Sequence, residues 1–437
     1  MTDLPPGAPT PWAAPPAGTV TVYRGATLFD GTGGPLRPNT TIVTDGARLH
    51  TVAGDADPLP PHAADAPQVD LDGRFVVPGL VDTHQHLATP PDRPVAEAVL
   101  RRLVYSGVTA VRDMADDLRH VGDLARATLV GEIPGPDIRY AALMAGPSFF
   151  DDPRTHEVSR GTVPGAVPWM QAVTPGTDLP IAVALARGTH AAAIKVYADL
   201  DAATVAAVTA EAHRQGIAVW AHATVFPAAP GEVVAAGVDS VSHVTLLAFE
   251  DPTEPLSSYK TKPPVDHDRF AAGDAPKLAA LFAEMCRRGT VLDATASMWT
   301  SDELRGDTAE SVERAARNAE LAAAVTAQAY RAGVEVCTGT DHETDPGDPF
   351  PALYGELGFL VDRCGVPAAD VLRSATLVGA RAAGTEADMG TVEPGKLANF
   401  AVLDENPLDD IGNLRTITYT VRRGHRFDRA EFEKDAQ

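Results

Sequence analysis

The chain has 437 residues, of which 44% are hydrophobic, so it can bury a large core and global disorder is not expected. Its 36 Lys and Arg residues stand against 59 Asp and Glu residues, which gives a formal net charge of −23. Nucleic acids and anionic membranes repel so acidic a surface, and no basic run offsets it, so neither is expected as a partner.

Residues 1–19 are rich in Pro and are predicted to form a flexible N-terminal arm. They also lack the features of a secretory signal. No stretch of 18 uncharged apolar residues is long enough to span a membrane. The cysteines, Cys286, Cys337 and Cys364, are few and widely spaced, which fits a reducing compartment rather than a disulfide framework. We therefore expect a cytoplasmic protein.

Both ends of the chain carry the pattern of short β-strands. Apolar and polar residues alternate around Gly and Asp in 19–31, 40–54 and 68–79, and again in 395–407 and 417–427. Two β-rich ends that flank a different middle predict one small β-sandwich domain, made of residues 20–76 and 385–437.

The middle of the chain, residues 77–384, alternates short apolar runs with Ala-rich helical stretches. The eight strand candidates are 79–86, 107–115, 137–146, 191–199, 216–224, 237–244, 289–298 and 333–341. Eight strands that alternate with helices predict an α/β fold, a parallel (β/α)₈ TIM barrel. Two irregular segments, 147–180 and 250–275, follow strand ends, where such barrels place their active-site loops.

Polar residues that can bind metals recur where these strands end. They are His84, His86, Lys195, His222, His243 and Asp341. A single His or Asp at a strand end is usually an ordinary polar residue or a cap, but the joint pattern favours a metal site at the barrel mouth. Six candidates exceed the three ligands of one catalytic zinc and suit two ions. A buried ammonium is costly, so Lys195 is expected to be ion-paired or chemically altered.

The motifs "PGLVDTHQH", "IKVYAD", "WAHAT", "AGVDSVSHV" and "GTD", in this order, resemble the markers of the amidohydrolase superfamily. "MGTVEPGKLANFAVLDENPL" resembles its returning C-terminal segment, so the resemblance covers residues 20–430. Within the superfamily the chain is most similar to the imidazolonepropionase-like and prolidase-like branch. The resemblance implies two divalent ions, with zinc expected, bridged by a CO₂-derived carbamate on Lys195. His84, His86 and Asp341 would hold the first ion, and His222 and His243 the second.

The resemblance also implies a hydrolase that cleaves an amide or peptide-like C–N bond. A hydroxide that bridges the metals would attack the carbonyl, and Asp341 would act as general base and then as general acid. Family deaminases carry a glutamate three residues after the fifth-strand histidine, where this chain has Val225, and true imidazolonepropionases lack the lysine. A lactonase, esterase or cyclic amidase of the same superfamily remains open, and a deaminase or a non-catalytic scaffold is disfavoured.

Three further residues are candidates for contact with a small-molecule substrate. Tyr197 follows Lys195 by two residues and faces the same way, but it could equally pack inside the barrel. His342 adjoins Asp341 and either lines the pocket or supports a ligand. His156 lies in the first irregular segment, where it either reaches over the site or is solvated. The sequence allows a homo-oligomer but leaves the oligomeric state, the metal and the exact substrate open.

Overall fold

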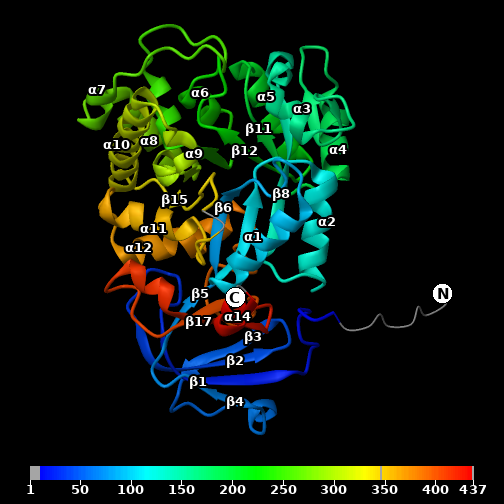
Figure 1. The fold of residues 1–437 in the computed structure, drawn as a ribbon, viewed down its shortest axis with the longest axis vertical. Helices are drawn as coiled ribbons and strands as arrows, with labels where there is room; N and C mark the ends of the chain where they lie inside the picture. The colour runs from blue at the N-terminus through cyan, green and yellow to red at the C-terminus, as the bar shows by residue number, and fades with distance from the viewer. Residues whose placement is uncertain (1–9, 345–346, 436–437) are drawn as a thin grey trace, which may run out of the picture.

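The computed structural model describes residues 10–344 and 347–435. Figure 1 shows a barrel with its surrounding helices, and beneath it in this view a sheet in which blue N-terminal strands lie beside red C-terminal ones. No helix among the described residues combines the length and the apolar character needed to cross a bilayer.

The barrel consists of eight parallel strands that follow one another in chain order. They are β6 (Leu80–Gln85), β7 (Val108–Asp113), β8 (Asp137–Ala145), β11 (Ala193–Val196), β12 (Ala218–His222), β13 (Ser240–Ser242), β14 (Val291–Asp293) and β15 (Val336–Cys337). Each strand pairs in parallel with the next. Backbone hydrogen bonds of 2.8 Å from Thr83 to the Thr338 carbonyl and of 2.9 Å from Asp341 to the His84 carbonyl connect the first strand to the segment after the last. The predicted α/β barrel is confirmed, and all eight strands lie within their predicted ranges.

The helices cover the outside of the barrel. They are α1 (Arg93–Tyr105), α2 (Leu118–Leu129), α4 (Leu179–Gly188), α5 (Ala202–Arg214), α6 (Pro230–Ala235), α8 (Pro276–Arg288), α10 (Ala309–Arg331), α11 (Leu353–Asp362), α12 (Ala368–Arg373) and α13 (Gly379–Ala382). The connections between strands and helices contain the short helix α9 (Asp302–Arg305) and the short segments η3 (Val244–Glu250), η4 (Ala296–Thr300) and η5 (Ser374–Val378). Asp residues begin several of them: Asp92, Asp178 and Asp201 each accept a hydrogen bond from a backbone N–H of the first turn. Gly289 ends α8 with a left-handed φ of 72°.

The two irregular segments fold over the barrel mouth. Residues 147–180 contain η2 (Pro147–Asp151), α3 (Pro153–Val158), β9 (Ala166–Val167) and β10 (Met170–Ala172), and β10 pairs in parallel with β8. Residues 250–275 contain only one short helix, α7 (His267–Ala271). The first segment follows the end of β8 directly, and the second follows β13 after η3, so both come after strand ends as predicted.

The second sheet is mixed and joins both ends of the chain. Its strands are β1 (Val20–Leu28), β2 (Arg37–Asp45), β3 (Arg48–Gly54), β4 (Gln68–Asp70), β5 (Phe75–Pro78), β16 (Phe400–Leu403), β17 (Ile417–Arg422) and β18 (His425–Asp428), accompanied by η1 (Pro61–Ala63), η6 (Ile411–Thr416) and α14 (Arg429–Asp435). β16 lies antiparallel to β5 and so attaches the C-terminal strands to the N-terminal ones. The predicted separate sheet from both chain ends is confirmed, whereas its boundaries at residues 76 and 385 remain predictions.

The sheet and the barrel are tied together by buried charges. Asp137, the first residue of β8, is paired with Arg422 at the end of β17 and lies 2.9 Å from Nε of Arg423. The predicted N-terminal arm is described only from Thr10 onwards, and residues 1–9 lie outside the described part. Within it, the backbone N–H of Trp12 donates to the carbonyl of Gly131 at 3.1 Å, so this part of the arm contacts the barrel.

Candidate metal centre

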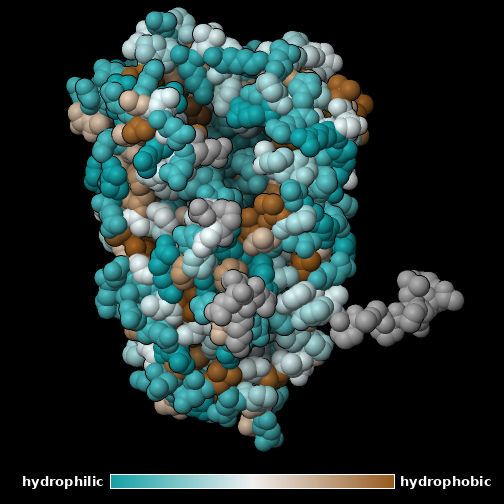
Figure 2. Space-filling model, viewed as in Figure 1, coloured by the Kyte–Doolittle hydropathy of each residue, from teal (hydrophilic) through white to brown (hydrophobic). Residues whose placement is uncertain are grey.

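A cavity of about 590 Å³ opens where the barrel strands end. Its walls include His86, which directly follows β6, and His222, the last residue of β12. Phe149 and Tyr259, one from each irregular segment, also line it. Figure 2 shows that this side of the molecule is mostly hydrophilic, with a hollow in the barrel half. The cavity at the barrel mouth is therefore the candidate active site.

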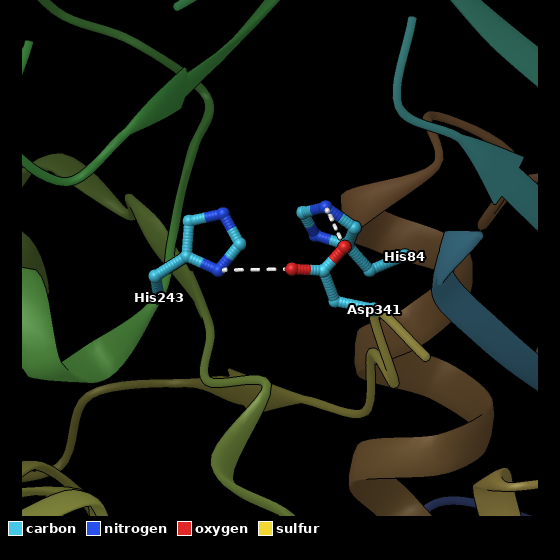
Figure 3. A group of neighbouring side chains, drawn as sticks. All are labelled: His84, His243 and Asp341. Carbon is cyan, nitrogen blue, oxygen red and sulfur yellow. Dashed lines mark ion pairs between the residues drawn. The ribbon is translucent and has the colours of Figure 1, made fainter. Parts of the chain in front are cut away.

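Asp341 lies among three imidazole rings in this cavity. Its Oδ1 atom is 3.5 Å from Nε2 of His84 and 3.3 Å from Nε2 of His86, and its Oδ2 atom is 3.7 Å from Nδ1 of His243. The ligand atoms of His84, His243 and Asp341 all lie within 4.8 Å of one another, and Figure 3 shows both imidazoles beside the carboxylate. Imidazole nitrogens and a carboxylate oxygen at this spacing form a metal-site candidate.

The backbone at two of these residues has an unusual conformation. His243 has a φ of 71° and Asp341 a φ of 56°, both in the left-handed region that non-glycine residues rarely adopt. Each residue stands where the chain leaves a barrel strand and turns into the next segment. Strained backbone of this kind concentrates at functional sites, where the surrounding structure holds it in place.

The fourth predicted histidine, His222, continues the same row of rings. Its ring centroid lies 4.8 Å from that of His243, which in turn lies 4.9 Å from that of His84. The Nδ1 atom of His222 is buried and has no hydrogen-bond partner among the described residues. A buried polar atom without a partner is costly, and a bound cation would satisfy it. This residue therefore fits a metal ligand.

Lys195 lies completely buried in β11, with its Nζ atom 3.1 Å from the hydroxyl of Ser242. Burial lowers the pKa of this amine to about 7, although Asp293 acts in the opposite direction. The Lys195 amine therefore loses its proton much more readily than the amine of an exposed lysine.

Burial also favours neutral imidazoles in this row. It lowers the pKa of His84, lowers that of His243 to about 3, and places that of His222 well below its usual value. At His86 burial acts in the same direction, but Asp116 and Asp341 overcome it and raise the pKa well above the usual value. A neutral imidazole is the form that coordinates a metal ion.

Two carboxylates outside the predicted set of site residues hold the first two histidines. Nδ1 of His84 lies 2.7 Å from Oδ2 of Asp293, and Nδ1 of His86 lies 2.8 Å from Oδ1 of Asp116. Each contact leaves Nε2 of the ring directed towards Asp341. Orientation of a ligand histidine by a carboxylate on its other nitrogen is characteristic of protein metal sites.

The outer part of the cavity is aromatic and cationic. The rings of Tyr197 and Phe149 lie 4.5 Å apart by centroid, and Tyr259 lies 5.8 Å from Tyr197. Nζ of Lys262 stands 4.0 Å above the Tyr259 ring. Arg154 also lines the cavity and is paired with Asp152. This wall can therefore accept an apolar group and an anionic group side by side.

The three predicted substrate contacts differ in position. Tyr197 lines the cavity, and its ring centroid is 3.9 Å from that of His222. His342 also lines the cavity and has its Nδ1 atom 2.8 Å from the Thr340 carbonyl. His156 is exposed on α3 and does not line the cavity, whereas Arg154 and Thr155 of the same helix do. The role of each in substrate binding remains a prediction.

Comparison with known proteins identifies the family. A model of the Amidohydrolase family matches residues 75–427. The chain belongs to the amidohydrolase family. It is therefore a hydrolase that acts on carbon–nitrogen bonds, and the donor set at the barrel mouth agrees with that class.

This amidohydrolase is similar to proteins of more than one activity. It is 27% identical over 421 residues to an imidazolonepropionase of Micrococcus luteus, an alignment that covers 84% of this chain and 93% of the relative. Its structure is similar to a Xaa-Pro dipeptidase with bound methionine in the active site, with a TM-score of 0.73, 22% identity and coverage of 94% and 100% of the two chains. An A. niger ochratoxinase is similar too, with a TM-score of 0.73, 22% identity and coverage of 94% and 96%. At these identities the structural likenesses establish the fold alone.

Proposed function

We propose that this amidohydrolase is a binuclear metal-dependent hydrolase that cleaves an amide or peptide-like C–N bond in a small substrate. The observation that carries the proposal is that four imidazole rings lie in a row beside the Asp341 carboxylate at the barrel mouth, while Lys195 is buried in β11, which pairs with β12. Three neighbouring donors would suffice for a single zinc, and the additional histidines and the lysine suit a second ion.

We assign His84, His86 and Asp341 to one ion and His222 and His243 to the other. Lys195 would join them as a carbamate formed with CO₂, and its lowered pKa favours the unprotonated amine that reacts with CO₂. Zinc is the expected metal, because imidazole and carboxylate are its common ligands. Two such ions would supply an activated water nucleophile and a Lewis acid for the substrate carbonyl.

Asp341 is proposed as the proton carrier of the reaction. Its two carboxylate oxygens face different histidines, so the group lies at the centre of the donor set. From this place it would take a proton from the attacking nucleophile and then deliver it to the leaving nitrogen. The aromatic wall of Tyr197, Tyr259 and Phe149 would hold the acyl side of the substrate and limit water around the reacting carbonyl.

We further propose that the substrate carries a carboxylate. Lys262 forms no ion pair among the described residues and stands over Tyr259 at the cavity wall. An ammonium there can pair with a carboxylate of the substrate. The methionine bound in the active site of the similar Xaa-Pro dipeptidase also has a carboxylate. N-acyl amino acids and dipeptides are the substrate classes that combine an amide bond with such a group.

The test combines metal analysis with a substrate panel. The panel contains N-acyl amino acids, dipeptides, the same compounds as C-terminal amides, lactones and aryl esters. We expect two divalent ions per chain and hydrolysis of the acid-bearing amides in preference to their neutral counterparts. One ion per chain would overturn the binuclear centre, no ion would favour a scaffold, and preference for lactones or esters would overturn the substrate class.

A further inference from the structure

Asp293, the last residue of β14, is fully buried and accepts hydrogen bonds from residues of two other barrel strands, β6 and β13. Its Oδ1 atom accepts from the Thr83 hydroxyl at 3.0 Å. Its Oδ2 atom accepts from the Ser242 hydroxyl at 2.9 Å and lies 2.7 Å from Nδ1 of His84. An ionised carboxylate only accepts, so His84 must carry its hydrogen on Nδ1 and present a free electron pair at Nε2.

A buried arginine compensates the charge of this carboxylate. Nη2 of Arg112 lies 3.2 Å from Oδ2 of Asp293, and both side chains are fully buried. Nε and Nη1 of Arg112 donate to the Thr83 carbonyl at 2.8 Å and to the Ser240 hydroxyl at 2.9 Å. The guanidinium also stacks on the Trp220 ring, with its Cζ atom 4.5 Å from the centroid. Because a lone buried carboxylate would be very costly, this pairing allows Asp293 to remain charged inside the barrel.

Ser242 connects Asp293 to the buried lysine. Its hydroxyl donates to Asp293 and accepts from Nζ of Lys195 at 3.1 Å. A single carboxylate therefore reaches one histidine directly and the lysine through one hydroxyl. The histidine, His84, and the lysine, Lys195, belong to opposite halves of the barrel, on β6 and β11.

Gly339 shows how tightly this carboxylate is enclosed. A Cβ atom on Gly339 would lie 2.1 Å from Oδ1 of Asp293 and 2.7 Å from Cβ of His84. Atoms cannot approach so closely, so only glycine fits there. The segment that carries Asp341 thus packs directly against the contact between Asp293 and His84.

We propose that Asp293 is a positioning residue of the metal centre, which orients His84 directly and Lys195 through Ser242 so that both halves of the centre form together. The inference rests on the proposed function, because it concerns how that centre is held. It predicts that loss of the Asp293 charge weakens metal binding without removing any proposed ligand. Removal of an outer partner of a ligand histidine typically weakens metal affinity about 10- to 100-fold.

The decisive comparison uses Asp293→Asn and Asp137→Asn. Both remove the charge of a buried carboxylate paired with a buried arginine, but Asp137 lies at the opposite end of its strand from the cavity. Zinc content after dialysis and zinc affinity by chelator competition are measured on each, with folding checked by circular dichroism. We expect affinity about 10- to 100-fold lower in Asp293→Asn and unchanged in Asp137→Asn, and excess zinc should restore turnover in Asp293→Asn.

Ser242→Ala provides a second route if Asp293→Asn does not fold. It removes one hydroxyl and keeps both His84 and Asp293, so we expect a folded protein with several-fold weaker zinc binding. If Asp293→Asn folds, wild-type zinc affinity in that variant would overturn the inference. If only Ser242→Ala folds, wild-type zinc affinity in Ser242→Ala would overturn it. The number of ions bound by the wild type tests the binuclear centre separately. A wild-type chain that binds only one ion could still lose zinc affinity on Asp293→Asn.

Discussion

His84 and Asp341 lie at opposite ends of the barrel's chain order, yet Oδ1 of Asp341 is 3.5 Å from Nε2 of His84. Closure of the barrel brings them together, since the Asp341 N–H donates to the His84 carbonyl. Asp82 reinforces this junction, because its carboxylate accepts from the His84 N–H at 3.1 Å and from the Thr340 hydroxyl at 3.0 Å. The donor set therefore depends on a complete barrel.

Replacement of Asp341 by Asn should leave a folded protein that has lost nearly all turnover. The amide keeps the size of the side chain but cannot carry a proton, so kcat should fall about 10²- to 10⁴-fold. Steady-state kinetics with a hydrolysed substrate from the panel measures the effect, and zinc content is measured in parallel because Asp341 is also a proposed ligand. A kcat within a few-fold of wild type would remove Asp341 from the proton-carrying role.

Replacement of Lys195 by Ala should reduce bound metal, because the proposed bridge between the two ions is lost. Lys396→Ala is a matched control: it also removes a largely buried lysine, but one that lies in the segment leading to β16 and is paired with Glu393 at 3.3 Å. Elemental analysis should show two ions per chain in Lys396→Ala and fewer in Lys195→Ala. Two full equivalents in Lys195→Ala would refute the carbamate bridge.

Replacement of Lys262 by Met should impair only substrates that carry a carboxylate. The change removes the ammonium over Tyr259 and keeps the aliphatic stem, so kcat/KM for acid-bearing amides should fall about tenfold. The neutral C-terminal amides of the same compounds should be hydrolysed as by the wild type.

Lys260→Met controls for the loss of one positive charge near the mouth. Lys260 lies two residues away, is exposed and does not line the cavity. We expect wild-type kcat/KM for every substrate in this variant. An equal loss in both variants would point to a general electrostatic effect instead of a contact, and no loss in either would remove Lys262 from substrate binding.

Asp137→Asn should destabilise the protein most at neutral pH. Burial alone would raise the pKa of Asp137, but Arg422 and Arg423 overcome it and hold the pKa below its usual value. A carboxyl with a depressed folded-state pKa stabilises the protein above its unfolded value of about 3.9, and this contribution is lost as the pH falls through the folded value. Breaking a buried pair from one side costs about 3 kcal/mol in the free energy of unfolding.

Urea unfolding of the wild type and Asp137→Asn at several pH values checks both the size and the sign. The difference between the two proteins should be constant above about pH 5 and should shrink below about pH 4. Asp388→Asn serves as control, since Asp388 pairs with Arg48 at 3.0 Å on the surface and should matter by less than about 1 kcal/mol. A difference that grows in acid would contradict the assignment of the Asp137 charge.

Periodicity and strand-end chemistry predicted the barrel and the sheet from both chain ends. The signal was strong because each barrel strand is a short apolar run, and because parallel strands must place their last residues at one mouth. His84, His222, His243 and Asp341 could therefore be expected to meet, although the sequence could not show which donors would lie nearest. The triplet whose ligand atoms all lie within 4.8 Å of one another combines His84 with His243 and Asp341, and so includes histidines from both of the groups that the resemblance implies.

Asp293 and Arg112 were missed although a signal for them existed. A buried charge in an apolar strand needs a partner, and this holds for Asp293 and Arg112 as it does for Lys195. Lys262 and Tyr259 had no such signal. They lie in an irregular segment whose path depends on packing against distant residues, which local sequence does not specify.

The most direct measurement is a crystal structure of the zinc-loaded protein with anomalous diffraction at the zinc edge. The account predicts two anomalous peaks about 3.5–4 Å apart at the barrel mouth, with His84, His86 and Asp341 on one, His222 and His243 on the other, and extra density on Lys195 between them. A single peak with Lys195 unmodified, or no peak near Asp341, would contradict it.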